Sequence, residues 1–207
     1  MKITYNGHAC FSITSGGFTI IIDPYSPGSV PGYEDLNESA NQILCTHEHG
    51  DHNARNVIHQ ITGTDSPFTI QTISTWHDDA HGQLRGSNTI FILCAEGRHI
   101  VHLGDLGCPL SSSELEQIRG CDVLLIPVGG HYTIDAAVAA AIARQVEAGI
   151  TVPMHYSGKG FGYDVIAPVD AFIRQMSDVK ALDTASIELP MDDMHKVIVL
   201  HAKYRQK

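Results

Sequence analysis

The stretch from Thr46 to His52 places several metal-binding side chains within seven positions. Its sequence, THEHGDH, holds three histidines and one aspartate in the spacing HxHxDH. Alternate side chains of an extended segment face the same side, so His47 and His49 can point at one ion. Neutral imidazole and carboxylate groups are ligands for zinc, iron and manganese. The pattern therefore predicts a site for two metal ions rather than a solvated histidine-rich loop.

The neighbouring sequence indicates how this loop is held. The apolar run Ile43–Cys45 predicts a buried strand that enters it, and the polar stretch Asn53–Gln60 is helix-capable. Asp51 and His52 would start that helix, where the change of direction lets them face a second point nearby. Other apolar or alternating runs predict strands at residues 2–5, 9–14, 18–22, 68–75, 87–95, 99–103, 123–127, 151–154 and 196–202.

Helices are expected after each block of strands. Ser111 and Glu114 have capping-box spacing, which predicts a helix that ends near residue 119. A longer helical pattern covers residues 134–148, with Thr133 as its expected N-cap and Gly149 as its C′ glycine. A further helix is expected within residues 164–177. Periodicity alone indicates one α/β or α+β domain over residues 1–207.

Composition limits the classes of function. A chain of 207 residues with 43% hydrophobic residues suits one domain with a sizeable core. The formal net charge of −10 argues against nucleic acid as the main partner. No apolar run approaches the roughly 18 residues of a membrane span, so no membrane association is expected. Five scattered cysteines without a CxxC pair fit a reducing compartment, and we expect a cytoplasmic protein.

Four further motifs accompany the histidine-rich loop, in a fixed order along the chain. They are Asp23 after the run at 18–22, His77 after the run at 68–75, Asp105 after Gly104, and His155 after the run at 151–154. His81 is an alternative to His77, but His77 follows the strand directly. This ordered series resembles the signature of the metallo-β-lactamase superfamily. The resemblance implies an α+β fold, a four-layer αββα sandwich in a single domain, with metal bound at one edge between the sheets.

The resemblance also assigns roles to the motif residues. It implies two ligand sets that share Asp105: His47, His49 and His77 on one ion, and Asp51, His52 and His155 on the other. Asp23 would orient the metal loop through hydrogen bonds. The expected cofactor is a pair of divalent cations, with zinc as the first candidate and manganese or iron as alternatives.

Within the superfamily, the chain is most similar to small stand-alone metal-dependent hydrolases related to the ascorbate-6-phosphate lactonase branch. The segments that support this similarity are residues 6–11, 77–78, 85–88, 102–107 and 127–130. That branch often has a histidine after the Gly-Asp-Leu-Gly run, where this chain has Cys108. We interpret Cys108 as a buried structural cysteine.

The implied chemistry is hydrolysis by a metal-bound hydroxide, with Asp51 or Asp105 holding the water and accepting its proton. The expected substrate is a small anionic or carbonyl-containing molecule: a lactone, ester, amide or phosphoester. Four other side chains are candidates for contacting the substrate or orienting a ligand: Asp78, Lys159, His131 and His8.

Three alternatives remain open from the sequence. A phosphodiesterase or nuclease on this fold would need a substrate-clamping insertion and a basic surface, and the chain offers neither pattern. An iron-dependent redox enzyme would use the same histidine and carboxylate ligands. A metal-binding protein without catalysis is the third alternative.

Overall fold

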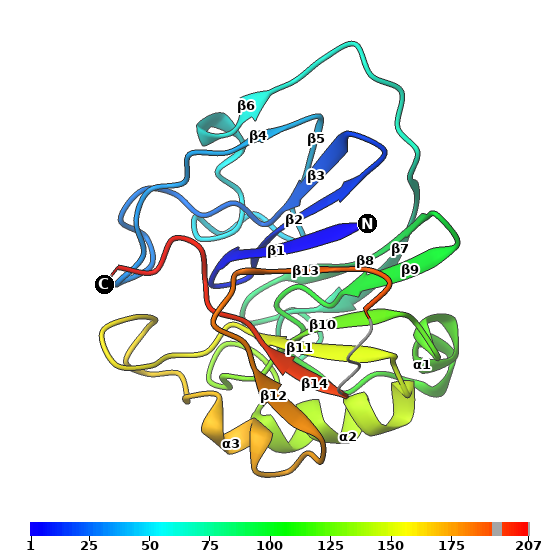
Figure 1. Cartoon of the computed structure of the whole chain (residues 1–207). Coiled ribbons are helices and arrows are strands. Elements are labelled where there is room, and N and C mark those ends of the chain that lie inside the picture. Colours follow the sequence, from blue (N-terminus) through cyan, green and yellow to red (C-terminus); the bar gives the residue numbers. More distant parts are fainter. Residues whose placement is uncertain (192–195, 207) are drawn as a thin grey trace.

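The computed structural model describes residues 1–191 and 196–206, which form two facing β-sheets with helices packed on one outer side (Figure 1). The first sheet has the order β13-β1-β2-β3-β5. Its strands are β1 (Lys2–Gly7), β2 (Cys10–Ser15), β3 (Phe18–Ile22), β5 (Gln42–Leu44) and β13 (Ser186–Glu188). A short pair, β4 (Ser39–Ala40) and β6 (His59–Gln60), lies apart from it.

The second sheet has seven strands in the order β12-β14-β11-β10-β9-β8-β7. They are β7 (Thr69–Trp76), β8 (Ser87–Ala95), β9 (Arg98–His102), β10 (Val123–Pro127), β11 (Ile150–Met154), β12 (Val179–Ala181) and β14 (Val197–Val199). The helices are α1 (Ser112–Ile118), α2 (Ala136–Val146) and α3 (Asp170–Ile173), with a 3₁₀ turn at Arg55–Val57. No helix in the described ranges is long and apolar enough to cross a membrane.

The central strands β10 and β11 of the second sheet are buried on both faces, which explains their largely apolar sequences. In β10, Val123 and Leu125 belong to the core shared with the first sheet. Leu124 and Ile126 belong instead to the core beneath α1, α2 and α3. A strand covered on both sides needs apolar residues at every position, as the sequence VLLIP provides.

The two facing sheets and the helical layer agree with the expected sandwich. The outer face of the first sheet is covered differently, because the 3₁₀ turn, β4, β6 and their loops lie there in place of a full helix (Figure 1). Side chains of these loops, Leu36, Ala40 and Ile58, join the core behind β3. The helix predicted from Asn53 to Gln60 is therefore wrong. Its backbone is drawn into other contacts, since Ala54 N–H donates to the carbonyl of Pro24.

The ends of the helices confirm one predicted cap and contradict two others. The capping box of Ser111 and Glu114 is confirmed at the start of α1. For α2 the predicted N-cap is wrong, because the side chain of Asp135 accepts the N–H groups of Ala137 and Val138. The predicted C′ glycine is wrong as well, since Glu147 adopts the left-handed conformation at φ 55°. Within residues 164–177 only the four residues of α3 are α-helical.

The strand directions bring several strand ends to one edge of the sandwich. Strands β9, β10 and β11 are parallel neighbours, and β7 runs the same way because β8 is antiparallel to both β7 and β9. In the first sheet, β3 and β5 are also parallel. The loops after the carboxyl ends of parallel strands meet at one edge. Each predicted site residue of the five motifs lies just after one of these ends.

Candidate metal centre

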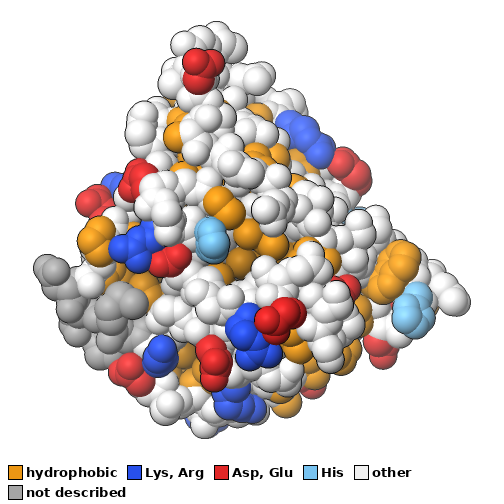
Figure 2. All heavy atoms as spheres, turned by 90° about the vertical axis from the view of Figure 1, so that its right-hand side faces the viewer, with side chains coloured by type: hydrophobic (Ala, Val, Ile, Leu, Met, Phe, Trp, Pro, Cys, Tyr) orange, Lys and Arg blue, Asp and Glu red, His pale blue; other side chains and the backbone are white. Residues whose placement is uncertain are grey.

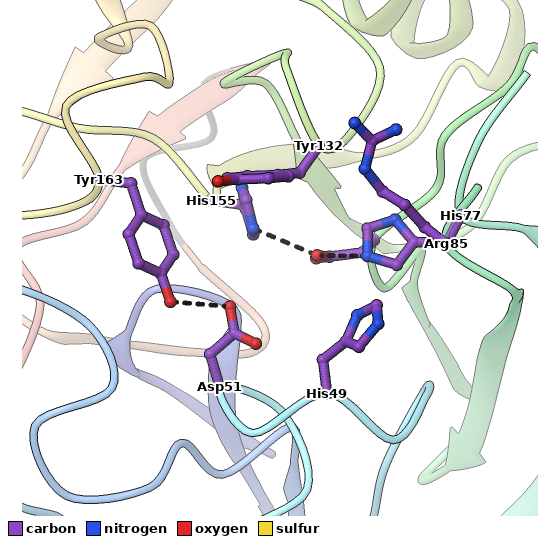
Figure 3. A pocket seen from close by; sticks show the side chains of 8 residues that line it. His49, Asp51, His77, Arg85, Tyr132, His155 and Tyr163 are labelled. Atoms are coloured by element: carbon purple, nitrogen blue, oxygen red, sulfur yellow. Dashed lines mark hydrogen bonds and ion pairs between the residues drawn. The ribbon is translucent and has the colours of Figure 1, made fainter.

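The carboxylate of Asp105 lies at the centre of a ring of imidazoles from both sheets. Its side chain is almost fully buried, at 2% exposure. Four Nε2 atoms surround its Oδ2 atom: those of His52 and His155 at 3.2 Å, His77 at 3.4 Å and His47 at 4.0 Å. Figure 3 shows the side chains of His49, His77 and His155 directed into the same pocket as that of Asp51. The structure thus brings together all seven residues predicted as ligands.

The ligand atoms of this site form three groups, and one of these, made of Asp23, His47 and His52, overlaps the other two. Those of His47, His49 and His77 lie within 4.8 Å of one another. A second group has the same limit and contains His8, Asp51, His52 and His155. The first group has the composition predicted for one ion, and the second adds His8 to the set predicted for the other. His8 is fully buried, and its Nε2 atom lies 3.2 Å from Oδ2 of Asp51.

Asp23 sets the tautomers of two histidines from behind the loop. Its carboxylate accepts the Thr46 N–H and hydroxyl, both at 2.7 Å, and the Nδ1–H of His52 at 2.9 Å. Because the Thr46 hydroxyl donates to Asp23, it can only accept from Nδ1 of His47, 3.0 Å away. Both imidazoles therefore carry a proton on Nδ1, which leaves Nε2 as the ring nitrogen that faces Asp105. Such outer partners orient metal-ligating histidines and raise their basicity.

Burial and neighbouring charge shift the pKa values in the ring. Burial lowers the pKa of His47 to about 3 and that of His8 to about 4, so both are neutral at pH 7. Burial also disfavours protonated His52, but Asp105 and Asp23 outweigh it and raise its pKa well above 6.5. Burial would raise the pKa of Asp105, yet the imidazoles of His155 and His52 hold it well below 3.8. The ring therefore attracts positive charge toward Asp105.

Three residues of the site have backbone conformations that L-residues rarely adopt. His8, Asp23 and His155 have φ values of 56°, 51° and 52°. Each such residue costs of order 1–3 kcal/mol and persists only where its surroundings hold it. His155 N–H donates to the carbonyl of His8 at 2.9 Å, which couples two of them. The strain aims the side chains of all three residues at the strand edge.

Asn88 holds the backbone that carries Asp105. Its side chain is fully buried and accepts the Asp105 N–H at 3.0 Å. Its amide donates to the Leu103 carbonyl at 2.9 Å and to the Thr75 hydroxyl at 2.8 Å. Asn88 was part of the sequence resemblance, but nothing in the sequence pattern indicated this positioning role.

Gly107 allows the Asp105 loop to lie against the end of β7. A Cβ atom at residue 107 would overlap the backbone of His77 and Asp78. We expect Gly107→Ala to lower the free energy of unfolding by about 1–3 kcal/mol and to weaken metal binding, because the two loops must separate. Urea denaturation measures the first effect. Gly50→Ala is the matched control inside the HxHxDH loop, since its Cβ meets open space and should change stability by less than about 0.5 kcal/mol. Equal stability of the two variants would contradict this prediction.

A cavity of about 350 Å³ opens over the ring. The residues that line it are His49, Asp51, His77, Arg85, Asp105, Tyr132, His155 and Tyr163. Lys159 and His131, two predicted substrate contacts, are exposed and are not among these residues. Asp78 has a different role from the one predicted: its carboxylate accepts four backbone N–H groups of its own loop, from residues 80, 82, 84 and 85.

Sequence reasoning did not select Arg85 or Tyr163 as site residues. The Tyr163 hydroxyl lies 3.2 Å from Oδ2 of Asp51 and 2.9 Å from the carbonyl of Ser29. Arg85 lies in the segment 85–88 that supported the family similarity but received no role there, and Tyr163 lies in no motif; only the long-range fold places them at the cavity. Cys108 lies beside the carbonyl of Trp76 and is half-buried rather than fully buried.

The side chains of the ring fit metal ions, because several of their buried atoms lack a hydrogen-bond partner. The Nε2 atoms of His47, His52 and His155 and the Oδ1 atom of Asp105 are buried without a hydrogen-bond partner. Buried polar atoms are normally satisfied, and lone pairs that converge without a donor are costly. A cation among these atoms would satisfy them together. Imidazole and carboxylate are also the ligand types that divalent transition metals accept.

Comparison with known proteins finds a matching domain family and several similar metal-dependent hydrolases. The model of the beta-lactamase superfamily domain matches residues 2–155. A metal-dependent hydrolase of Hyperthermus butylicus is 28% identical over 190 residues, covering 75% of this chain and 83% of that protein. One from Methanoculleus marisnigri is 30% identical over 188 residues, covering 75% and 81%. A proposed Zn-dependent hydrolase of the metallo-beta-lactamase superfamily from Thermotoga maritima is 32% identical, with a TM-score of 0.76 and coverage of 96% and 97%.

The matched domain includes every residue of the imidazole ring, and the chain belongs to the beta-lactamase superfamily. Its fold is the metallo-β-lactamase fold, as the sequence resemblance implied. Within the superfamily it is a metal-dependent hydrolase, which confirms the predicted enzyme class.

Proposed function

We propose that the chain binds two divalent cations, with zinc as the first candidate, and hydrolyses a small molecule. The observation that carries this proposal is the position of Asp105, whose Oδ2 atom lies within 4.0 Å of four Nε2 atoms contributed by both groups of ligands. A single carboxylate between two clusters of imidazoles suits a shared ligand. His47, His49 and His77 would hold one ion, and Asp51, His52 and His155 the other.

The chemistry follows from this arrangement. Bound divalent cations lower the pKa of a bound water toward about 7 and polarise a carbonyl or phosphoryl oxygen. The chain itself provides a group that can hold this water, because Oδ1 of Asp105 is buried without a hydrogen-bond partner. Asp51 is held in place by His8 and by the Tyr163 hydroxyl, each 3.2 Å from its Oδ2 atom. We assign to Asp105 or Asp51 the role of orienting the attacking water and accepting its proton.

The cavity supports a small substrate with a carbonyl or phosphoryl centre, such as a lactone, ester, amide or phosphoester. Its volume of about 350 Å³ lies at the low end of the range for small-molecule sites. Acidic and basic side chains are interspersed over the face shown in Figure 2, and the chain has a net charge of −10. These properties favour a small molecule over nucleic acid. All five cysteines are free thiols, which supports our proposal of a cytoplasmic location.

Metal analysis tests the proposal directly. Protein purified without added metal should carry about two equivalents of divalent metal per chain by plasma mass spectrometry. The loaded protein should hydrolyse at least one member of a panel of lactones, aryl esters, anilides and phosphodiesters. Iron as the resident metal, together with oxygen consumption, would favour redox chemistry instead. Only trace metal, not restored by dialysis against zinc, manganese or iron, would contradict the proposed centre.

A further inference from the structure

Among the residues that the structure describes, Arg85 is the one Lys or Arg side chain that lines the cavity over the imidazole ring. It is half-buried and comes from the loop between β7 and β8. In Figure 3 it lies beside Tyr132, on the side of the pocket opposite His49 and Asp51. A substrate that reaches the metal ligands would therefore pass within reach of its guanidinium group.

Arg85 has no carboxylate partner within the described part of the chain, and its guanidinium carbon lies 5.6 Å from the centre of the Tyr132 ring. Several other arginines are paired with acids: Arg55 with Glu48, Arg98 with Asp122 and Arg119 with Glu116. Glu48 lines an adjoining hollow together with Arg85, but it already makes two contacts with the guanidinium group of Arg55, at 2.7 and 3.0 Å. The guanidinium of Arg85 is therefore free for a ligand.

The position of Arg85 relative to the ring is fixed by the buried carboxylate of Asp78. Oδ2 of Asp78 accepts the Arg85 N–H at 2.7 Å, and the same carboxylate binds three other N–H groups of the loop. The loop is also tied to the strand end that carries a predicted ligand, because His77 N–H donates to the carbonyl of Gly86 at 3.0 Å. The backbone from which the Arg85 side chain extends is therefore held in place beside His77.

We propose that Arg85 binds an anionic group of the substrate, a carboxylate or phosphate, while the scissile bond lies at the imidazole ring. A guanidinium group that packs on an aromatic ring keeps its N–H fork available, and that fork matches a carboxylate or phosphate in a bidentate way. Tyr132 provides the ring. This inference rests on the proposed hydrolytic centre and names its substrate class: a small ester, lactone, amide or phosphoester that carries a second, anionic group.

Three hydroxamates of matched length test the inference by binding, without turnover. Each would attach its hydroxamate to the metal centre: butyrohydroxamate has a neutral tail, succinic monohydroxamate a carboxylate, and 3-phosphonopropionohydroxamate a phosphonate. Calorimetry on the metal-loaded protein should give at least one anionic probe an affinity about tenfold or more above that of the neutral probe. The comparison of the two anionic probes tells carboxylate from phosphate. The difference should shrink as salt is raised, because the site is open to solvent.

Variants separate Arg85 from the metal centre. In Arg85→Gln the anionic probes should lose their higher affinity, while butyrohydroxamate should bind as tightly as to the unaltered protein. Arg85→Lys should keep part of the advantage, since it retains the charge but loses the fork. Arg119→Gln is the matched control, because Arg119 lies at the end of α1 and contacts Glu116 and the carbonyl of Gln145. Equal affinity for all three probes in the unaltered protein would overturn the inference and leave the centre intact. No binding of butyrohydroxamate would contradict the proposed centre and the inference together.

Discussion

Replacing Asp105 by alanine should reduce the metal content from about two ions per chain to about one or fewer, and turnover by at least about a hundredfold. The reason is geometric, because Oδ2 of Asp105 is the atom nearest to both ligand groups, at 3.2 Å from Nε2 of His52 and of His155 and at 3.4 Å from that of His77. Its loss also removes the negative charge that offsets the two cations. Plasma mass spectrometry and a hydrolysis assay on the same samples measure both effects.

Asp122→Asn is a suitable control for this variant. Asp122 directly precedes β10, at the opposite end of the strand from the site, and pairs with Arg98 at 2.7 Å. Its variant should retain the full metal content. Asp105→Asn keeps the shape of the side chain and should lose metal almost as fully as Asp105→Ala, since the charge is removed. Full metal occupancy in both Asp105 variants would show that Asp105 is not a shared ligand.

Removing the metal should lower the midpoint of thermal unfolding by about 10 °C. Occupancy at about a thousandfold over the dissociation constant contributes roughly 4 kcal/mol, and each kcal/mol shifts the midpoint of a domain of this size by about 2–4 °C. The structural reason is the set of partnerless atoms in the ring, which include Nε2 of His47, His52 and His155. Without a cation these atoms stay buried and unsatisfied. Scanning calorimetry before and after treatment with a chelator measures the shift.

The same experiment has an internal control. Asp105→Ala should show a much smaller shift with chelator than the unaltered protein, because less of its metal can be lost. Adding zinc back should restore the midpoint of the unaltered protein, whereas magnesium should not, since its preferred ligands are oxygens. Identical midpoints with and without metal would mean that the imidazole ring contributes nothing to the stability of the fold.

Much of the sandwich and the location of the site could be predicted because the signals are local. Strands β3, β8 and β10 have the predicted bounds, since each reads as an apolar or alternating run between turn residues. The candidate ligands follow strand ends directly, and a strand end is recognisable without knowing the partner strand. Parallel pairing then places His77, Asp105 and His155 at one edge. That these residues bind metal stays a prediction.

What could not be predicted depends on contacts between distant segments. Neither Arg85, which lies in the segment 85–88 of the family similarity, nor Tyr163 could be assigned a role from the sequence, because only the packing of their loops against the ring places them at the cavity. Asp78 was expected to orient a ligand imidazole. Its carboxylate instead accepts backbone N–H groups of the loop that follows it. The helix expected at residues 53–60 failed for the same reason, because its backbone bonds to the distant Pro24.

The ring of ligands draws on both halves of the sandwich, and this gives a bound metal pair a mechanical role. His47, His49, Asp51 and His52 follow a strand of the first sheet, whereas His77, Asp105 and His155 follow strands of the second. Ions held by both sets act as a removable cross-link between the layers. Separation of the sheets at this edge would then require the metal–ligand bonds to break. Loss of the ions and opening of the sandwich would therefore be one kinetic event.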